Sequence, residues 1–173
     1  MVTGRYSAGL VRELGAHFEN ETANVFPIFG AIAALEGAKS ARPSRTKDAS
    51  PFDRHKWLKG LWHVHYTQAQ FMRRNLELHW KPVHRQNRLI KDSFDGWELW
   101  QAVRDFSKRY VEGYLQRGDD NELTGEWVVF AKQDGVNYYL TLGTHKKEDE
   151  AIWRRCKACA PEFPGLRIIQ EDR

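Results

Sequence analysis

The sequence has few of the features that mark secreted or membrane proteins. It contains two cysteines in 173 residues, too few for a disulfide framework. Its longest mostly apolar run, residues 25–35, is about half of the ~20 residues that a membrane-spanning helix needs. The first ten residues lack the charged start and apolar core of a signal peptide. We therefore expect a cytoplasmic protein with reduced thiols and no membrane partner.

The chain also lacks the short motifs of several common enzyme classes. It contains no G-x-x-x-x-G-K-[ST], G-x-G-x-x-G, G-x-S-x-G or H-E-x-x-H. P-loop, dinucleotide-dependent, serine hydrolase and zincin activities therefore lose support. Cys156 and Cys159 form a C-x-x-C, but zinc needs four ligands and no second pair exists. We interpret the two cysteines as packed side chains on a helix, and we expect no cofactor.

Positive charge is concentrated in one part of the chain. Residues 39–91 contain 13 Lys and Arg against three acidic residues, a net charge of +10, whereas the remaining residues carry 14 against 20, a net charge of −6. Five of the seven histidines also fall within residues 39–91. Such a segment predicts an anionic partner, and we favour nucleic acid, RNA before DNA. A solvated surface with a basic loop explains the charge equally well.

Residues 126–142 predict a β-hairpin. Two β-rich runs flank Asp134-Gly135, a dipeptide that suits a type I′ turn because both central residues need a positive φ. In this register Gln133 pairs with Val136 and Lys132 pairs with Asn137. One face is then apolar and faces the core: Trp127, Val129, Ala131, Val136, Tyr138, Leu140 and Leu142. The other face is mixed, and we weigh an ordinary half-buried sheet face against a surface that holds a substrate: Glu126, Val128, Phe130, Lys132, Asn137, Tyr139 and Thr141.

Apolar spacing predicts the remaining elements around this hairpin. The expected helices span residues 6–18, 22–36, 53–61, 67–80, 95–118 and 147–160. Short strands are expected at residues 62–66 and 166–169, an irregular basic segment at 81–91, and a mobile basic loop at 38–51. We expect one α+β domain over residues 1–173, with N-terminal helices, a central basic helical and loop region, and a C-terminal helix. The long amphipathic helix that begins at Asp95 is expected to pack across a small antiparallel sheet built on the hairpin.

Two groups of residues are candidates for chemistry. His63 and His65 alternate along a strand, so both imidazoles lie on one face. A metal site would need a further ligand, such as His79, His84 or His145, and no acidic residue is close in sequence. We expect no metal, and we weigh acid–base or phosphate contacts against simple packing. The second group is the mixed hairpin face, because polar groups on a rigid sheet can hold a substrate.

Together these patterns favour a small basic protein that acts on nucleic acid, specifically a metal-independent, toxin-like RNA endonuclease. The proposed catalytic groups are His63, His65, His145 and Lys132, and the proposed substrate contacts are Arg73, Arg74, Asn137, Tyr139 and Thr141. The order of elements is similar to that of small basic ribonucleases of the barnase and RelE-like toxin kind, although no motif of those families is matched. The alternatives are a non-catalytic nucleic-acid-binding protein and a protein-interaction adaptor that uses exposed Trp and Tyr side chains.

Overall fold

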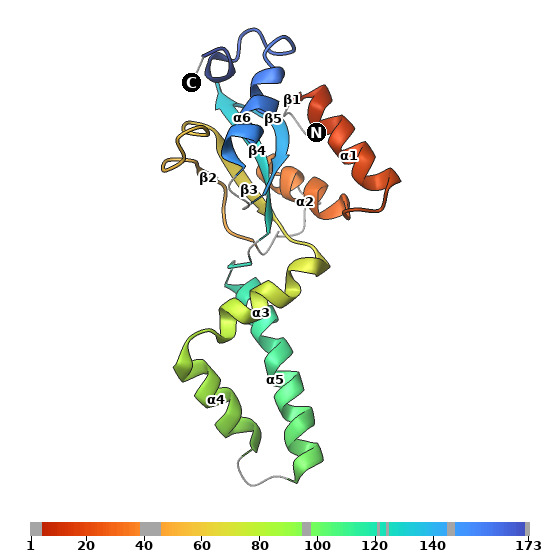
Figure 1. Ribbon diagram of the computed structural model, residues 1–173, viewed down its shortest axis with the longest axis vertical. Helices are drawn as coiled ribbons and strands as arrows, with labels where there is room; N and C mark the ends of the chain where they lie inside the picture. Colours follow the sequence, from red (N-terminus) through yellow and green to blue (C-terminus); the bar gives the residue numbers. More distant parts are fainter. Residues whose placement is uncertain are drawn as a thin grey trace. The chain divides into compact units, whose positions relative to one another are not determined.

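The computed structural model of the chain describes residues 5–38, 46–94, 98–120, 122–123, 125–144 and 148–171 (Figure 1). The described residues form six α-helices and a five-stranded mixed sheet, which confirms the predicted α+β class. The chain divides into two compact units. The sheet unit comprises residues 1–44, 48–66 and 125–173, and the helical unit comprises residues 45–47 and 67–124. The single domain expected over residues 1–173 stays a prediction.

The sheet unit is built on the hairpin of β4 (Glu126–Gln133) and β5 (Val136–Gly143). The turn residues Asp134 and Gly135 have φ of 52° and 74°, the left-handed conformation that a type I′ turn requires. The strands lie in the order β1-β5-β4-β3-β2. β1 pairs with β5 in parallel, and the other neighbours pair antiparallel. The three outer strands are β1 (Arg5–Tyr6), β2 (Ser50–Pro51) and β3 (Trp62–Tyr66).

A β-bulge changes the hairpin register beyond the turn. The pairs Gln133–Val136 and Lys132–Asn137 occur in the structure, but the register shifts between Val129 and Phe130. Val129 pairs with Thr141, whereas the sequence predicted Leu140. The extra residue places Leu140 and Thr141 opposite Val129. Strict alternation cannot reveal such an insertion, so the register predicted beyond Phe130 is wrong.

Most side chains on both faces of the hairpin are buried, although Lys132 is exposed, so the second face is not an open surface. On one face, buried side chains pack with α6 (Asp149–Ala158) and with the segment 52–61: Trp127, Val129, Ala131 and Leu140. On the other face, buried side chains pack beneath α1 (Ala8–Glu19) and α2 (Phe26–Leu35): Val128, Phe130, Tyr139 and Leu142. The position that the sequence assigned to the helix from Asp95 is therefore taken by α6.

Capping groups fix the starts of the two N-terminal helices. Ser7 is the N-cap of α1, and its hydroxyl accepts a hydrogen bond from Leu10 N at 2.9 Å. The Asn24 side chain accepts from Phe26 N at 3.1 Å, and Pro27 lies in the first turn of α2, where it is tolerated. Both helices lie close to their predicted positions.

Three segments differ from the elements predicted for them. Residues 53–61 form turns rather than a helix, and residues 166–169 form the 3-10 helix η2 (Arg167–Ile169) rather than a strand. Residues 81–91, predicted to be irregular, lie in α4 (Val83–Phe94), which begins directly after Pro82. Only Leu89 and Ser93 of α4 are buried, so its apolar pattern is too sparse to indicate a helix. Asp95 and residues 39–45 of the expected basic loop lie outside the described residues.

The helical unit consists of η1 (Ala69–Phe71), α3 (Met72–Trp80), α4 and α5 (Leu99–Asp119). Both α3 and α4 pack against α5. Their contact is a ladder of partly buried rings, in which Tyr110 stacks on Trp80 and on Phe106, and Phe106 contacts Phe94. The Trp80 indole also donates to Tyr110 O at 3.0 Å. Of the helices in the described ranges, none combines the length and apolar character needed to cross a bilayer.

Gly113 should be essential to the packing of α3 against α5. A Cβ at this position would lie 2.6 Å from His79 Cδ2 and 2.8 Å from Trp80 Nε1. We expect Gly113→Ala to lower the free energy of unfolding of the helical unit by about 1–3 kcal/mol, the usual cost of overpacking. Chemical denaturation followed by Trp fluorescence would measure the change.

Gly15 on α1 is the matched control, because nothing lies within 4 Å of a Cβ added there. We expect Gly15→Ala to leave stability unchanged or to raise it by about 0.5–1 kcal/mol, since alanine favours a helix. A Gly113→Ala variant as stable as Gly15→Ala would show that α3 and α5 are not in close contact.

Candidate functional site

The polar groups of the second hairpin face hold α2 against the sheet. Tyr139 is buried, and its hydroxyl donates to Glu36 Oε1 at 2.5 Å. Asn137 Nδ2 donates to the same oxygen at 2.8 Å. Burial, together with the hydrogen bond to the Glu36 carboxylate, raises the pKa of Tyr139 above its ordinary value. The hydroxyl therefore stays protonated near neutral pH and acts as a donor within the fold.

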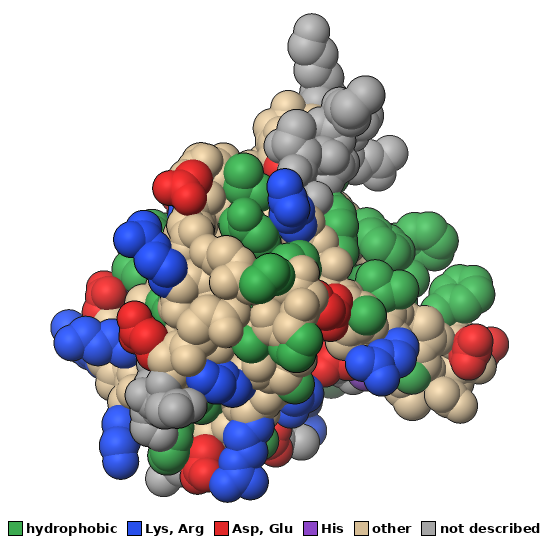
Figure 2. Space-filling view, turned by 90° about the horizontal axis from the view of Figure 1, so that it is seen from above, with side chains coloured by type: hydrophobic (Ala, Val, Ile, Leu, Met, Phe, Trp, Pro, Cys, Tyr) green, Lys and Arg blue, Asp and Glu red, His purple; other side chains and the backbone are tan. Residues whose placement is uncertain are grey.

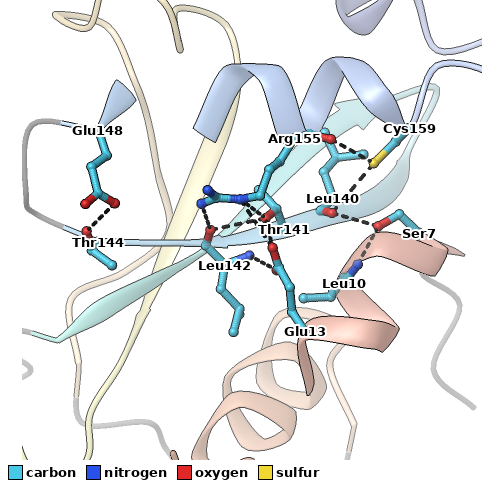
Figure 3. A network of polar contacts seen from close by, with 10 residues as sticks. All are labelled: Ser7, Leu10, Glu13, Leu140, Thr141, Leu142, Thr144, Glu148, Arg155 and Cys159. Carbon is cyan, nitrogen blue, oxygen red and sulfur yellow. Dashed lines mark hydrogen bonds and ion pairs between the residues drawn. The ribbon is translucent and has the colours of Figure 1, made fainter. Parts of the chain in front are cut away.

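Thr141 belongs to a charged network along the edge of β5 (Figure 3). Its hydroxyl donates to Glu13 at 2.7 Å, and Leu142 N donates to the same carboxylate at 2.8 Å. Arg155 of α6 lies 3.2 Å from Glu13 and donates to Leu142 O at 3.0 Å. The backbone of Leu142 thus bonds to a carboxylate from α1 and a guanidinium from α6, in place of a neighbouring strand.

Ser7 and Cys159 extend this network without adding a reactive group. Ser7 Oγ donates to Leu140 O at 2.7 Å, and the buried Cys159 thiol lies 3.3 Å from Arg155 O. Burial raises the pKa of Cys159, so the unreactive thiol form dominates. A cavity of about 290 Å³ adjoins the network, and its charged lining is balanced. Two arginines and two glutamates line it: Arg12, Arg155, Glu13 and Glu162.

The other predicted phosphate contacts lie in different parts of the chain. Lys132 is exposed on the sheet unit, and its Nζ lies 3.7 Å from the centre of the Trp62 ring. Arg73 and Arg74 are exposed on α3 of the helical unit, where both lie near Glu77, at 2.9 and 3.7 Å. His145 lies outside the described residues.

Three imidazoles gather around Trp127 on the α6 side of the sheet. His63 and His65 extend from β3 with ring centres 5.2 Å apart, and they lie 5.3 and 6.4 Å from the Trp127 ring. His55 lies on the segment 52–61, and its ring centre is 6.0 Å from that of Trp127. The sequence indicated the first two residues but not His55.

The three histidines differ in how accessible they are. His65 is buried, and its Nδ1 donates to Gly125 O at 3.2 Å. His63 is half-buried, with its Nε2 3.4 Å from Ser50 Oγ. The side chain of His55 is 36% exposed, and its Nδ1 lies 2.7 Å from Asp149 Oδ2. Of the three, His55 is therefore the best placed to meet a molecule from solution.

The contact between His55 and Asp149 selects one tautomer of the neutral imidazole. A carboxylate can only accept a hydrogen bond, so Nδ1 carries the proton and Nε2 of the neutral ring carries a lone pair. Asp149 is the first residue of α6. From the sequence alone, its negative charge was expected only to stabilise the start of that helix. The two residues are 94 positions apart, and no local pattern links them.

The helical unit carries a second cavity, of about 440 Å³, with several arginines in its lining. Arg85 donates to His79 O at 3.1 Å, and Arg109 lies 3.9 Å from Asp92. Burial and the nearby guanidiniums lower the pKa of His79, so this imidazole is neutral near pH 7. The cationic and acidic lining residues are equal in number: Arg85, Arg88, Arg109, Asp92, Glu112 and Asp120.

Neither a metal site nor a similar known protein indicates the function of this chain. Within the described part of the chain, no group of three or more His, Cys, Asp or Glu side chains is arranged to hold a metal ion. The expected absence of a metal stays a prediction. Comparisons with known protein families, with curated proteins and with solved structures find no match to this chain. The functional argument therefore rests on the residues described above.

Tyr139→Phe tests whether this residue supports the fold or contacts a substrate. We expect the variant to lose about 1–3 kcal/mol of unfolding free energy, because Glu36 loses a buried donor. RNA affinity should be unchanged. Urea denaturation and an RNA titration would provide the two readouts.

Tyr138→Phe is the matched control, since the neighbouring Tyr138 is half-buried and its hydroxyl has no hydrogen-bond partner in the described structure. We expect this variant to retain wild-type stability. A Tyr139→Phe variant of normal stability but weakened RNA binding would return Tyr139 to the role of substrate contact.

Proposed function

We propose that this protein binds RNA through the basic side chains of α3 and α4. The observation that carries the proposal is the charge of residues 73–91, which include six Lys and Arg against the single acidic residue Glu77. Lys81, Arg88 and Lys91 are exposed and form no ion pair with any described residue. Such cations remain available to neutralise phosphates and to release the counterions bound to them.

The spacing of these residues along α4 supports a continuous contact. His84, Arg88 and Lys91 follow one another at intervals of four and three, so they lie on one side of the helix. All three side chains are exposed. A row of cations along one helix face suits the regular phosphates of a nucleic-acid backbone and carries little sequence preference.

The imidazoles of the sheet unit favour RNA over DNA as the substrate. Cleavage of a phosphodiester without metal can use a nucleophile within the substrate, and the ribose 2′-hydroxyl is such a group. A base, an acid and cations complete the chemistry. We therefore extend the proposal to metal-independent RNA cleavage, with an endonuclease as the enzymatic form and a non-catalytic RNA-binding protein as its alternative.

Exposed apolar side chains on α5 favour a second candidate function, a protein-interaction module. Leu99 and Trp100 are 71% and 84% exposed, and Val103, Val111 and Leu115 are also exposed. Exposed apolar clusters of this kind mark contacts between proteins. This candidate takes precedence if RNA titrations at low salt show no binding.

Removing the unpaired cations should reduce the salt dependence of RNA binding. We expect the triple variant Lys81→Gln, Arg88→Gln, Lys91→Gln to bind a single-stranded RNA more weakly. The slope of log Kd against log salt should fall by about 2, because each lost phosphate contact removes about 0.7 from it. Fluorescence anisotropy titrations at salt concentrations from about 50 to about 300 mM would measure the slope.

A matched control removes the same charge from cations that already have acidic partners. The control triple variant is Arg104→Gln, Lys108→Gln, Arg154→Gln. These three cations are exposed, and their ion-pair partners are Asp105, Glu112 and Glu150, in that order. We expect this control to keep most of the wild-type slope. Equal losses for the two triple variants would mean that net charge, rather than the α3–α4 surface, governs binding.

A further inference from the structure

We propose that His55, oriented by Asp149, is the general base of an RNA-cleaving site in the sheet unit. The inference rests on the RNA-binding function proposed above and deepens it by assigning the reacting groups. The geometry that carries it is the 2.7 Å contact between His55 Nδ1 and Asp149 Oδ2 beside two further imidazoles. His55 is the catalytic residue, and Asp149 is a positioning residue.

The pair combines a defined tautomer with access from solvent. Asp149 holds the proton on Nδ1, so Nε2 is the atom that can accept a proton from a substrate. The side chains of His55 and Asp149 are 36% and 29% exposed, which leaves the imidazole open on one side and supported on the other. Phe52 and Trp127 provide that support, with ring centres 4.9 and 6.0 Å from the imidazole.

Three cations adjoin His55 in the sequence of its own segment, against the single acidic residue Asp53. Arg54, Lys56 and Lys59 are exposed, and neither Arg54 nor Lys59 has an ion-pair partner in the described chain. A phosphate that approaches His55 would therefore meet positive charge that is not already neutralised. Figure 2 shows acidic and basic side chains interspersed on the face in view.

A second imidazole, that of His63, lies beside the rings that support His55. His63 packs against Phe52 and Trp127, the same two rings that support His55, with ring centres 4.3 and 5.3 Å away. It is half-buried, unlike the buried His65. Its Nδ1 is buried and its Nε2 faces Ser50 Oγ, so His63 supports the packing of this cluster and the acid of the reaction is solvent water.

The proposed step is an internal transesterification that needs no redox partner. His55 Nε2 takes the proton from a ribose 2′-hydroxyl, and the oxygen attacks the adjacent phosphorus. The bond between phosphorus and the 5′-oxygen breaks, a solvent water gives a proton to that oxygen, and the His55 imidazolium returns its proton to the resulting hydroxide. The products are a 2′,3′-cyclic phosphate and a 5′-hydroxyl. The exposed cations of the segment stabilise the charge on the pentavalent phosphorus.

The test uses the full chain with a mixed-sequence single-stranded RNA in the presence of a chelator. His55→Asn keeps a donor near the Nδ1 position for Asp149 but lacks Nε2. We expect cleavage to fall by about 10²–10⁴-fold with RNA affinity retained. Added imidazole should partly restore the activity of His55→Ala. Asp149→Asn should lower kcat by at least about tenfold with KM unchanged, because the tautomer is no longer fixed.

His17→Asn is the control variant, since His17 lies on α1 and pairs with Thr22 at 2.8 Å, apart from the Trp127 cluster. It should cleave normally. The 2′-deoxy form of the same oligonucleotide should bind and remain intact. When the wild type is treated with diethyl pyrocarbonate, the fraction of cleavage activity lost should equal the fraction of His55 that is modified. This measurement does not depend on the folding of any variant.

The outcomes separate this inference from the function on which it rests. A wild-type protein that binds the RNA and leaves it intact overturns the catalytic role of His55 but leaves the binding function standing. A protein that binds no RNA overturns both. If His55→Asn cleaves RNA at the wild-type rate, or if cleavage survives complete modification of His55, the catalytic assignment alone is overturned.

Discussion

The sheet unit depends on the contact between Glu13 and Arg155 at the edge of β5. β1 contains only two residues, so on that side the later part of β5 has no neighbouring strand, while β4 pairs with it on the other side. An open strand edge exposes backbone groups to pairing with other chains. Glu13 accepts from Leu142 N, and Arg155 donates to Leu142 O, so both backbone groups of this residue are satisfied. One ion pair thereby connects α1, α6 and the central hairpin.

This arrangement determines which polar groups remain available for function. Asn137, Tyr139 and Thr141 are all engaged with glutamates of α1 or α2, so their polarity serves the packing of helices on the sheet. Polar groups that stay accessible include those of the segment 52–61 and of the first turn of α6. His55 and Asp149 meet there because two elements that are distant in sequence cover the same sheet face. The helical unit contributes a separate feature, the exposed cations of α3 and α4.

Sequence patterns predicted the elements whose side chains follow a strong period. The Asp-Gly turn, α1, α2 and α6 lie close to their predicted positions, and Cys156 and Cys159 are buried as packed residues. The bulge at Leu140 could not be predicted, because one inserted residue leaves the composition of a strand unchanged. α4 was missed because only Leu89 and Ser93 are buried, too few to mark a helix by their spacing. For the site, alternation on one strand indicated His63 and His65, but a contact between His55 and Asp149 has no local signal.

Photo-crosslinking of a 4-thiouridine-substituted RNA to the full chain tests the central claim most directly. That claim is that the second hairpin face supports the fold, while RNA meets the segment 52–61 and the helices α3 and α4. Mass spectrometry of the digested complex should identify crosslinked peptides from residues 52–61 and 72–94. Crosslinks confined to residues 136–143, with none in the other two regions, would contradict the account.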